Sequence, residues 1–174
     1  MRVLQTTLPA LAAALSLAAV ASAAPLPNGM TSLSETYGDW VVACQMQNNA
    51  PRCQMSQTQT EPKTQQLFMA MEVRRNGDGT MAATLLMPFG LALKNGVTLQ
   101  VDDARQMVNA EFSTCLPNGC LVPVSIDQPT MQALQTAKTL NVSAVAAQEN
   151  KPFSAKVSLN GFAAGWARLN ELTK

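Results

Sequence analysis

The sequence contains no histidine among its 174 residues. This absence excludes a Ser-His-Asp triad, a Cys-His pair and any histidine-ligated metal site, because each of them needs an imidazole. Charged residues make up only 13% of the chain, and the longest run of basic residues is the pair Arg74-Arg75. Proteins that follow nucleic-acid phosphates carry clustered basic surfaces, so nucleic acid is not expected as a partner.

Long apolar runs are also missing, apart from one near the amino terminus. The chain opens MRVLQTTLPALAAALSLAAVASA, with a positive charge at Arg2, an apolar run over 8–20 and small residues at Ala21 and Ala23. This pattern is typical of a secretory signal peptide, and we predict that residues 1–23 are that peptide, cleaved after Ala23. No other segment reaches the roughly 20 apolar residues of a membrane-spanning helix, so no stable membrane span is expected. The predicted location is the periplasm, with outer-membrane association or secretion as alternatives.

The remaining chain has the length of one domain. Removing 23 of the 174 residues leaves 151, which is long enough to bury a substantial core. Residues 24–36, APLPNGMTSLSET, combine Pro, Gly and Ser, and we expect them to form a flexible lead-in. A single domain is therefore predicted over residues 37–174.

Alternating apolar residues predict a chain made mainly of short strands. In LFMAMEVR, for example, Leu67, Met69, Met71 and Val73 fall on alternate positions and would share one face of a strand. Similar segments are WVVACQ, CQMSQTQ, MAATLLM, VTLQVDD, QMVNAEFSTC, CLVPVSI, LNVSAVA and FSAKVSL. Many short strands separated by turns are typical of an antiparallel β-sandwich.

Two segments favour short helices instead of strands. In DQPTMQALQTAK, Asp127 is placed to cap the first turn and a proline follows near the helix start. In NGFAAGWARLNEL, Asn160 is a candidate cap, while Phe162, Trp166 and Leu169 lie on one helical face. The fold class predicted from the residues is thus mainly β, with one or two short helices.

The cysteines favour disulfides over metal or redox chemistry. The chain has four, and an exported protein with an even number of cysteines lies in a compartment where disulfides persist. In TCLPNGC, the Pro-Asn-Gly sequence suits a type I turn that would place Cys115 opposite Cys120, within disulfide reach. The same reasoning pairs Cys44 with Cys53 across the polar loop QMQNNAPR.

Other uses of the cysteines are weaker but remain distinct hypotheses. Neither spacing is the Cys-x-x-Cys of a thioredoxin-like centre, and a zinc site made from all four is disfavoured because closely spaced pairs are missing. Cross-pairing, such as Cys44 with Cys115, stays open because connectivity cannot be deduced from sequence.

The methionines raise the alternative of a copper site. The chain has ten, and thioether sulfurs select Cu(I). Met69 and Met71 would share a strand face, as would Met81 and Met87, and the two pairs would meet if their strands are neighbours. All four occupy alternating apolar positions, so core packing is the favoured interpretation.

Carboxylates and tryptophans complete the candidate set. An acid and base pair of the glycosidase kind would have to come from Glu72, Asp78, Asp102, Asp103 and Glu111. Three of these five lie at predicted turns, where Asp makes local hydrogen bonds, so solvated turns are favoured. Of the tryptophans, Trp40 is expected to pack on the Cys44–Cys53 disulfide, whereas Trp166 is a candidate partner contact that could equally belong to the core.

Several motifs in this order resemble a known family. They are YGDWVVAC with the following Cys53, the block MPFGLALKNGVTLQVDD, the Cys115 and Cys120 pair with its apolar strand, and the closing VSLNGFAAGWARL. Together they resemble the invasion-associated locus B family over about Tyr37 to Leu169. The family's cysteines map onto Cys44, Cys53, Cys115 and Cys120, and its glycines onto Gly90 and Gly96. Phe89 and Gly165-Trp166 depart from its usual pattern.

The resemblance implies a small exported protein of Gram-negative, mostly alphaproteobacterial type, with an immunoglobulin-like β-sandwich and no established enzymatic activity. Many relatives belong to free-living bacteria, so a role in invasion is not carried over. We therefore expect a non-enzymatic envelope protein that binds a protein or envelope partner and uses no cofactor. A periplasmic copper-binding protein is the alternative. The partner's identity and the oligomeric state are not assigned by the sequence.

Overall fold

The structure is a computed structural model that describes residues 26–64, 66–102, 106–148 and 150–173. The predicted signal peptide, residues 1–23, lies outside the described residues. The fold is mainly β, with two antiparallel sheets, two short helices and two disulfides, which confirms the fold class expected from the sequence. Within the described ranges, no helix combines the length and apolar character needed to cross a membrane.

A seven-stranded sheet, here called the large sheet, forms most of the molecule, with the strand order β1-β2-β3-β4-β5-β9-β8. In that order its strands are β1 (Ser32–Tyr37), β2 (Trp40–Gln47), β3 (Ala50–Thr60), β4 (Leu67–Arg75), β5 (Met81–Met87), β9 (Gly119–Ile126) and β8 (Thr114–Leu116). Strands β1 to β5 are consecutive in sequence and each pairs with the next in antiparallel order, so this part of the sheet is a meander.

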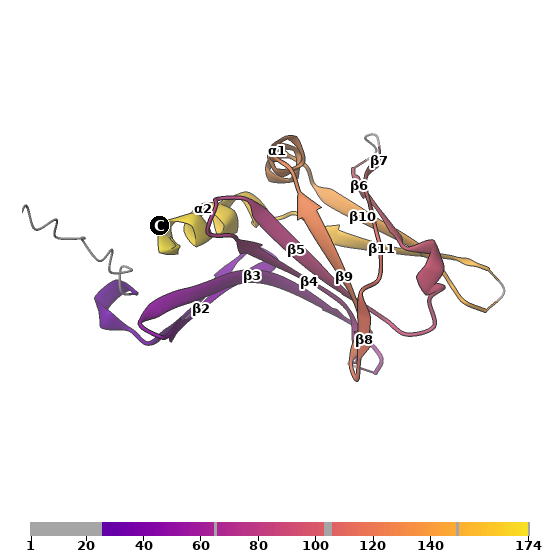
Figure 1. The fold of residues 1–174 in the computed structure, drawn as a ribbon, viewed down its shortest axis with the longest axis horizontal. Helices are drawn as coiled ribbons and strands as arrows, with labels where there is room; N and C mark the ends of the chain where they lie inside the picture. The colour runs from indigo at the N-terminus through magenta and orange to yellow at the C-terminus, as the bar shows by residue number, and fades with distance from the viewer. Residues whose placement is uncertain (1–25, 65, 103–105, 149, 174) are drawn as a thin grey trace, which may run out of the picture.

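A four-stranded sheet, the small sheet, packs against one face of the large sheet, with the order β11-β10-β6-β7. Its strands are β6 (Val97–Val101), β7 (Gln106–Ala110), β10 (Thr139–Val145) and β11 (Pro152–Ser158). The helices are α1 (Gln128–Thr136) and α2 (Phe162–Leu172), with 3-10 turns η1 (Pro27–Gly29) and η2 (Leu93–Asn95). Figure 1 shows both helices and the small sheet on the same side of the large sheet.

The core lies between this covered face, here called the inner face, and the elements packed on it. Alternation along β5 buries Met81, Ala83, Leu85 and Met87, as the sequence pattern predicts. The small sheet contributes its own alternating set, including Leu99 and Val142. The period-two pattern therefore identifies the inner face of most strands.

The first helix starts where the sequence predicts. The Asp127 side chain accepts a hydrogen bond from the Thr130 N–H at 2.9 Å, which caps α1, and Met131 and Leu134 are buried. In α2 the cap differs from the expectation, because Gly161 in a left-handed conformation, not Asn160, precedes the helix and makes no side-chain cap bond. The capping interpretation is thus confirmed for α1 and wrong for Asn160.

The second helix crosses the inner face of β2 and β3 at close range. A Cβ built on Gly165 would lie 3.2 Å from the Met55 terminal methyl carbon and 3.6 Å from a Val42 methyl carbon. A glycine in a helix costs about 1 kcal/mol of helix propensity relative to alanine. The close approach of α2 to β2 and β3 explains why a residue without a side chain occupies this position. Gly165 therefore has a definite packing role.

The ordered domain begins earlier than the sequence analysis placed it. Residues 24–36 were expected to be a flexible lead-in, but Ser32–Tyr37 form β1, which pairs with β2 from Ser32 opposite Gln45 to Tyr37 opposite Trp40. Leu26, just before η1, is also buried. In SLSETY, Ser32 and Ser34 lie on one face of the strand and Glu35 lies on the other. Because both faces carry polar residues, this edge strand lacks the alternation of apolar and polar residues that predicts a strand.

Glutamine side chains of β3 join the two sheets. Gln57, which is buried, donates from Nε2 to the Ser158 carbonyl at 2.8 Å and accepts the Ser158 N–H at 3.1 Å. Gln59 donates to the Lys156 carbonyl at 2.7 Å. The side chains thereby hydrogen-bond the backbone edge of β11 as a neighbouring strand would, which keeps that edge from pairing elsewhere.

Candidate functional site

Both predicted disulfides are present and local. Cys44 is bonded to Cys53 and Cys115 to Cys120, and each pair lies directly opposite in its ladder. The hairpin between Cys44 and Cys53 is tighter than the expected loop, since its strands continue to a two-residue turn at 48–49 with positive φ at both asparagines. No described cysteine is free.

The tryptophans occupy the core and not a binding surface. Trp166 keeps only 9% of its surface exposed, which favours the core position over the partner contact, the two interpretations that the sequence left open. Trp40 is fully buried, and its ring meets Phe162 edge-on with centroids 5.1 Å apart. Trp40 shares the core cluster with Cys44 and Cys53, its expected neighbours, and the ring contact with Phe162 adds a partner from α2.

The four methionines of the copper hypothesis lie in the closed core. The exposed fractions of Met69, Met71, Met81 and Met87 are 1%, 1%, 4% and 1%. They pack among the leucine and valine side chains of the inner face. This burial supports core packing and lends nothing to the copper-binding alternative.

The candidate carboxylates have separate structural partners. Asp102 accepts a hydrogen bond from the Thr139 N–H at 2.8 Å. This bond, and further ones from the Thr139 hydroxyl and the Lys138 N–H, lower the pKa of Asp102. Asp78 accepts the Thr80 hydroxyl at 2.6 Å in the turn between β4 and β5, which lowers the pKa of Asp78. Glu72 pairs with Arg74, Glu111 is exposed, and Asp103 lies outside the described residues. The described members of the set therefore favour the interpretation as turn and surface groups.

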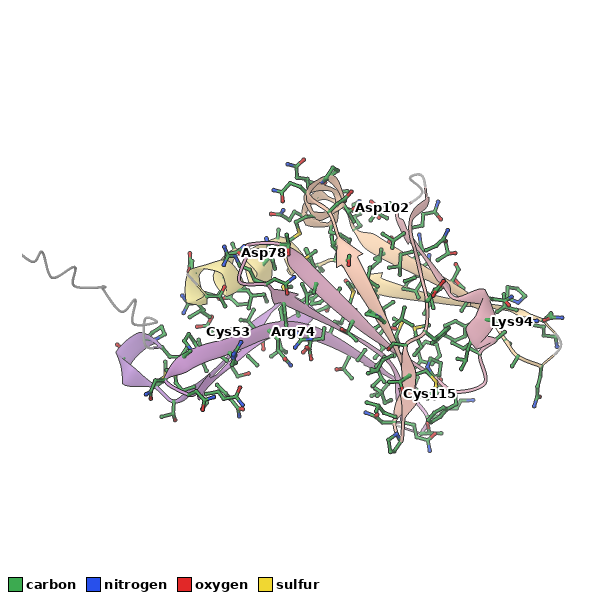
Figure 2. All side chains as sticks on the ribbon, viewed as in Figure 1. Cys53, Arg74, Asp78, Lys94, Asp102 and Cys115 are labelled. Carbon is green, nitrogen blue, oxygen red and sulfur yellow. A yellow bond between two sulfur atoms is a disulfide. The ribbon has the colours of Figure 1, made fainter. Side chains whose placement is uncertain are left out.

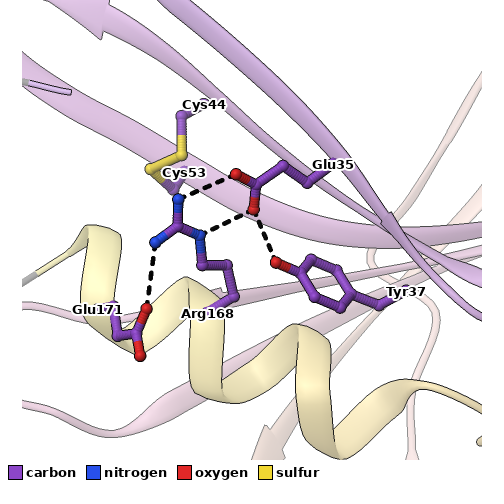
Figure 3. Close-up of polar contacts among 6 residues, drawn as sticks. All are labelled: Glu35, Tyr37, Cys44, Cys53, Arg168 and Glu171. Atoms are coloured by element: carbon purple, nitrogen blue, oxygen red, sulfur yellow. Dashed lines mark hydrogen bonds and ion pairs between the residues drawn. A yellow bond between two sulfur atoms is a disulfide. The ribbon is translucent and has the colours of Figure 1, made fainter. Parts of the chain in front are cut away.

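An ion-pair cluster that sequence reasoning missed ties the first strand to the last helix (Figure 3). Arg168 of α2 forms two hydrogen bonds with the Glu35 carboxylate of β1, at 2.8 and 2.9 Å, and a third with Glu171 at 3.1 Å. Tyr37 donates its hydroxyl to the same Glu35 carboxylate at 2.7 Å. A two-bond pair between guanidinium and carboxylate fixes orientation as well as distance, so it positions α2 against edge strand β1.

This cluster predicts an acid dependence of stability. The hydrogen bonds from Arg168, and after them the one from Tyr37, hold the pKa of the Glu35 carboxyl below its ordinary value of 4.5. A lowered folded-state pKa means that the stabilisation is present in full above pH 4.5 and is lost as the pH falls through the folded-state pKa. The stability difference between the wild type and Glu35→Gln should therefore shrink with acidification below that pH, as measured by urea unfolding.

The matched control for this experiment is Glu61→Gln, which removes an exposed carboxylate beyond the end of β3. Its stability difference from the wild type should change little over the same range. If the Glu35→Gln difference is constant with pH, the cluster does not stabilise the fold through the Glu35 charge.

The face of the large sheet opposite the core is open, and we call it the outer face. One register row across it joins Thr58, Ala70, Leu86 and Leu121, and the next joins Ser56, Glu72, Thr84 and Pro123. Most of these side chains are small and only partly buried. In Figure 2 the side chains on this side of the ribbon project away from both helices and the small sheet.

A shallow cavity of about 460 Å³ lies on the outer face. Its lining includes Ser56, Thr58, Ala70, Thr84 and Leu86. Larger and charged side chains, including the paired Glu72 and Arg74, complete the lining, so small and polar groups share this surface. In the sequence these residues are the members of each alternation that lie between the buried ones, which gives no sign that they form one continuous surface.

With this architecture in place, comparison with known proteins identifies the family. The family model described as "Invasion associated locus B (IalB) protein" matches residues 40–170. The chain belongs to the invasion associated locus B family. This finding confirms the resemblance based on the sequence motifs.

Individual members of the invasion associated locus B family support the assignment. The chain is 44% identical over 154 residues to the "Invasion protein B homolog" of Brucella abortus (strain 2308), covering 88% of each chain. It is 35% identical over 155 residues to "Invasion protein B" of Bartonella bacilliformis, covering 88% of this chain and 83% of the other. The crystal structure of invasion associated protein b from Bartonella henselae matches with a TM-score of 0.76 at 33% identity, over 80% of this chain and 96% of that one.

Proposed function

We propose that this member of the invasion associated locus B family is exported to the periplasm and acts there, or at the outer surface, by binding a protein or envelope partner without catalysis. The observation that carries the proposal is the open outer face of the large sheet. A partly exposed sheet face of mixed small, polar and apolar side chains, with a shallow cavity of about 460 Å³, offers a surface for a partner. Its leader-like start and its two disulfides support export to an oxidising compartment.

The titratable groups support a binding role over a catalytic one. The shifted pKa values belong to groups with a structural partner: the Asp127 cap, the Asp78 turn, the Asp102 loop contact and the Glu35–Arg168 cluster. Catalytic acids and bases are shifted by burial or by like charges in a cleft, whereas these carboxylates are held ionised by hydrogen bonds.

Site-specific photo-crosslinking in intact cells tests the proposal. A photoreactive residue at Thr84 lies in the middle of the outer face, and one at the exposed Ser143 of β10 provides the matched position on the small sheet. Thr84 should yield a defined higher-mass adduct under ultraviolet light and Ser143 should not. Mass spectrometry of the adduct then identifies the partner.

A second substitution tests whether the contact is specific. Ala70→Arg places a long charged side chain at the centre of the outer face, and it should reduce the Thr84 adduct by about tenfold or more because a buried unpaired charge opposes docking. The thermal midpoint checks that the variant folds. Binding at this face would be contradicted if Thr84 and Ser143 gave the same yield of adduct, or if Ala70→Arg left the yield from Thr84 unchanged.

A further inference from the structure

The large sheet forks between β3 and β4. Their ladder ends at Met55 opposite Val73, while the β2–β3 pairing continues to Gln47 opposite Ala50 and the β4–β5 pairing continues to Arg75 opposite Met81. Beyond Met55 and Val73 the two hairpins therefore separate. We call the space between residues 50–54 and 74–77 the fork.

The fork holds a cavity of about 500 Å³. The lining residues that matter for binding are Gln47, Arg52, Gln54, Arg74, Arg75 and Asn76. Three of these residues are arginines, three carry side-chain amides and none is acidic. In Figure 2, Cys53 and Arg74 mark the strands on its two sides. A cavity of this size is large enough for a small polar ligand.

The charges around the fork do not cancel. Arg74 pairs with Glu72 at 3.1 Å, but Glu72 lies on the outer face beside the fork and does not line it. Arg75 donates to the Thr173 carbonyl at 3.4 Å and is near Asp78, whose carboxylate is engaged by Thr80. Among the described residues no carboxylate pairs with Arg52. The lining therefore keeps an excess of positive charge.

We propose that the fork is a binding site for a phosphate or sulfate group carried by a sugar-sized ligand. Guanidinium groups offer two parallel N–H donors that match such oxyanions, and the charge assists each hydrogen bond. The amides of Gln47, Gln54 and Asn76 supply neutral donors and acceptors for the hydroxyl groups of the remainder. This site goes beyond the proposed partner face and does not depend on it, although Gln54 and Arg74 line both cavities.

The sequence alone does not reveal this set. Arg52 follows a proline near a hairpin turn, and the Arg74-Arg75 pair ends a different strand. They face a common space only because two hairpins pair along part of their length and then diverge. A short basic pair in a nearly neutral chain would otherwise be assigned to a solvated surface.

Solution NMR of the isotope-labelled mature protein tests the site, with inorganic phosphate and then glucose 6-phosphate as probes. The backbone amide signals of 50–54 and 74–77 should shift and saturate with increasing probe. Arg52→Glu should weaken the apparent affinity by about tenfold or more, because it removes a charge-assisted hydrogen-bond donor and places a negative charge beside the anion. Arg52→Lys, which keeps the charge but loses the two-donor geometry, should have an intermediate effect.

The matched control is Lys156→Glu, which makes the same charge change at an exposed position of β11 in the small sheet. It should leave the affinity within about twofold of the wild type, because surface charge acts weakly across a screened distance. Equal weakening by Arg52→Glu and Lys156→Glu would overturn the proposal, since it would indicate attraction to net charge alone. Absence of saturable shifts at the fork would overturn it as well.

Two further arms distinguish the source of the anionic group. Vesicles of phosphatidylcholine containing phosphatidylglycerol test a lipid headgroup, and glucose 6-phosphate tests a soluble ligand. Sedimentation with vesicles that is lost in Arg52→Glu assigns the group to a lipid, whereas binding of glucose 6-phosphate without sedimentation assigns it to a soluble ligand. Because purified protein and simple probes are used, failure here is separate from failure of the outer-face crosslinking.

Discussion

Replacing Gly161 with alanine is expected to lower the free energy of unfolding by about 3 kcal/mol or more, from left-handed backbone strain combined with overpacking. Gly161 precedes α2 with φ of 83°, in the region that favours glycine. A Cβ at this position would overlap the Tyr37 carbonyl oxygen and lie 2.8 Å from the Gly38 nitrogen. Both neighbours are backbone atoms of the turn between β1 and β2, so no flexible side chain can move aside.

Gly90 provides a matched control for the backbone strain. Its φ of 85° is nearly the same, but nothing lies within 4 Å of a Cβ built there. Gly90→Ala should therefore cost only the left-handed term of about 1–2 kcal/mol. Urea unfolding measures the difference in unfolding free energy between the two variants, provided that their m-values agree. If both variants lose the same unfolding free energy, the overlap of a Cβ at Gly161 with the β1–β2 turn adds nothing to the backbone strain.

Replacing Trp40 with alanine is expected to lower the free energy of unfolding by about 3–5 kcal/mol, the range for truncating a buried tryptophan. Trp40 is completely buried and meets the Phe162 ring at 5.1 Å, so the change leaves a cavity between β2 and α2. It also removes the 2.9 Å hydrogen bond from the indole Nε1 to the Ser158 carbonyl. This loss is a large share of the roughly 5–15 kcal/mol typical of a domain.

Trp40→Phe separates packing from hydrogen bonding. Phenylalanine keeps an aromatic ring beside Phe162, and the Ser158 carbonyl still accepts from Gln57. This variant should therefore lose clearly less than Trp40→Ala, and near-ultraviolet circular dichroism should retain a packed aromatic environment. If the two variants are equally destabilised, ring packing is not the main contribution of Trp40.

Local signals in the sequence predicted the strands, the α1 cap and the disulfides. Alternating apolar residues mark the inner face of β4 and β5, and Asp127 caps α1, because each depends on residues adjacent in the chain. The disulfide bridging Cys115 and Cys120 follows from the turn between them, since a tight hairpin places its flanking residues opposite one another.

Long-range features escaped the same reasoning. Glu35 and Arg168 are 133 residues apart in sequence, and no local pattern relates them. The strand β1 was missed because an edge strand with half-buried polar residues lacks the apolar alternation that marks an inner strand. Trp166 lies on a helical face correctly predicted to contain Phe162 and Leu169, yet periodicity cannot show what covers that face.

The sequence by itself therefore determined the strand-rich class, the local cross-links and the family membership of this protein, because these depend on residue type, short spacings and motif order. Only the tertiary structure decided which face of the large sheet is open and which arginines line one cavity. Those features arise from the pairing of strands distant in sequence and from the point at which the β3–β4 ladder ends. A ladder end depends on the register and twist of the whole sheet, which no short segment encodes.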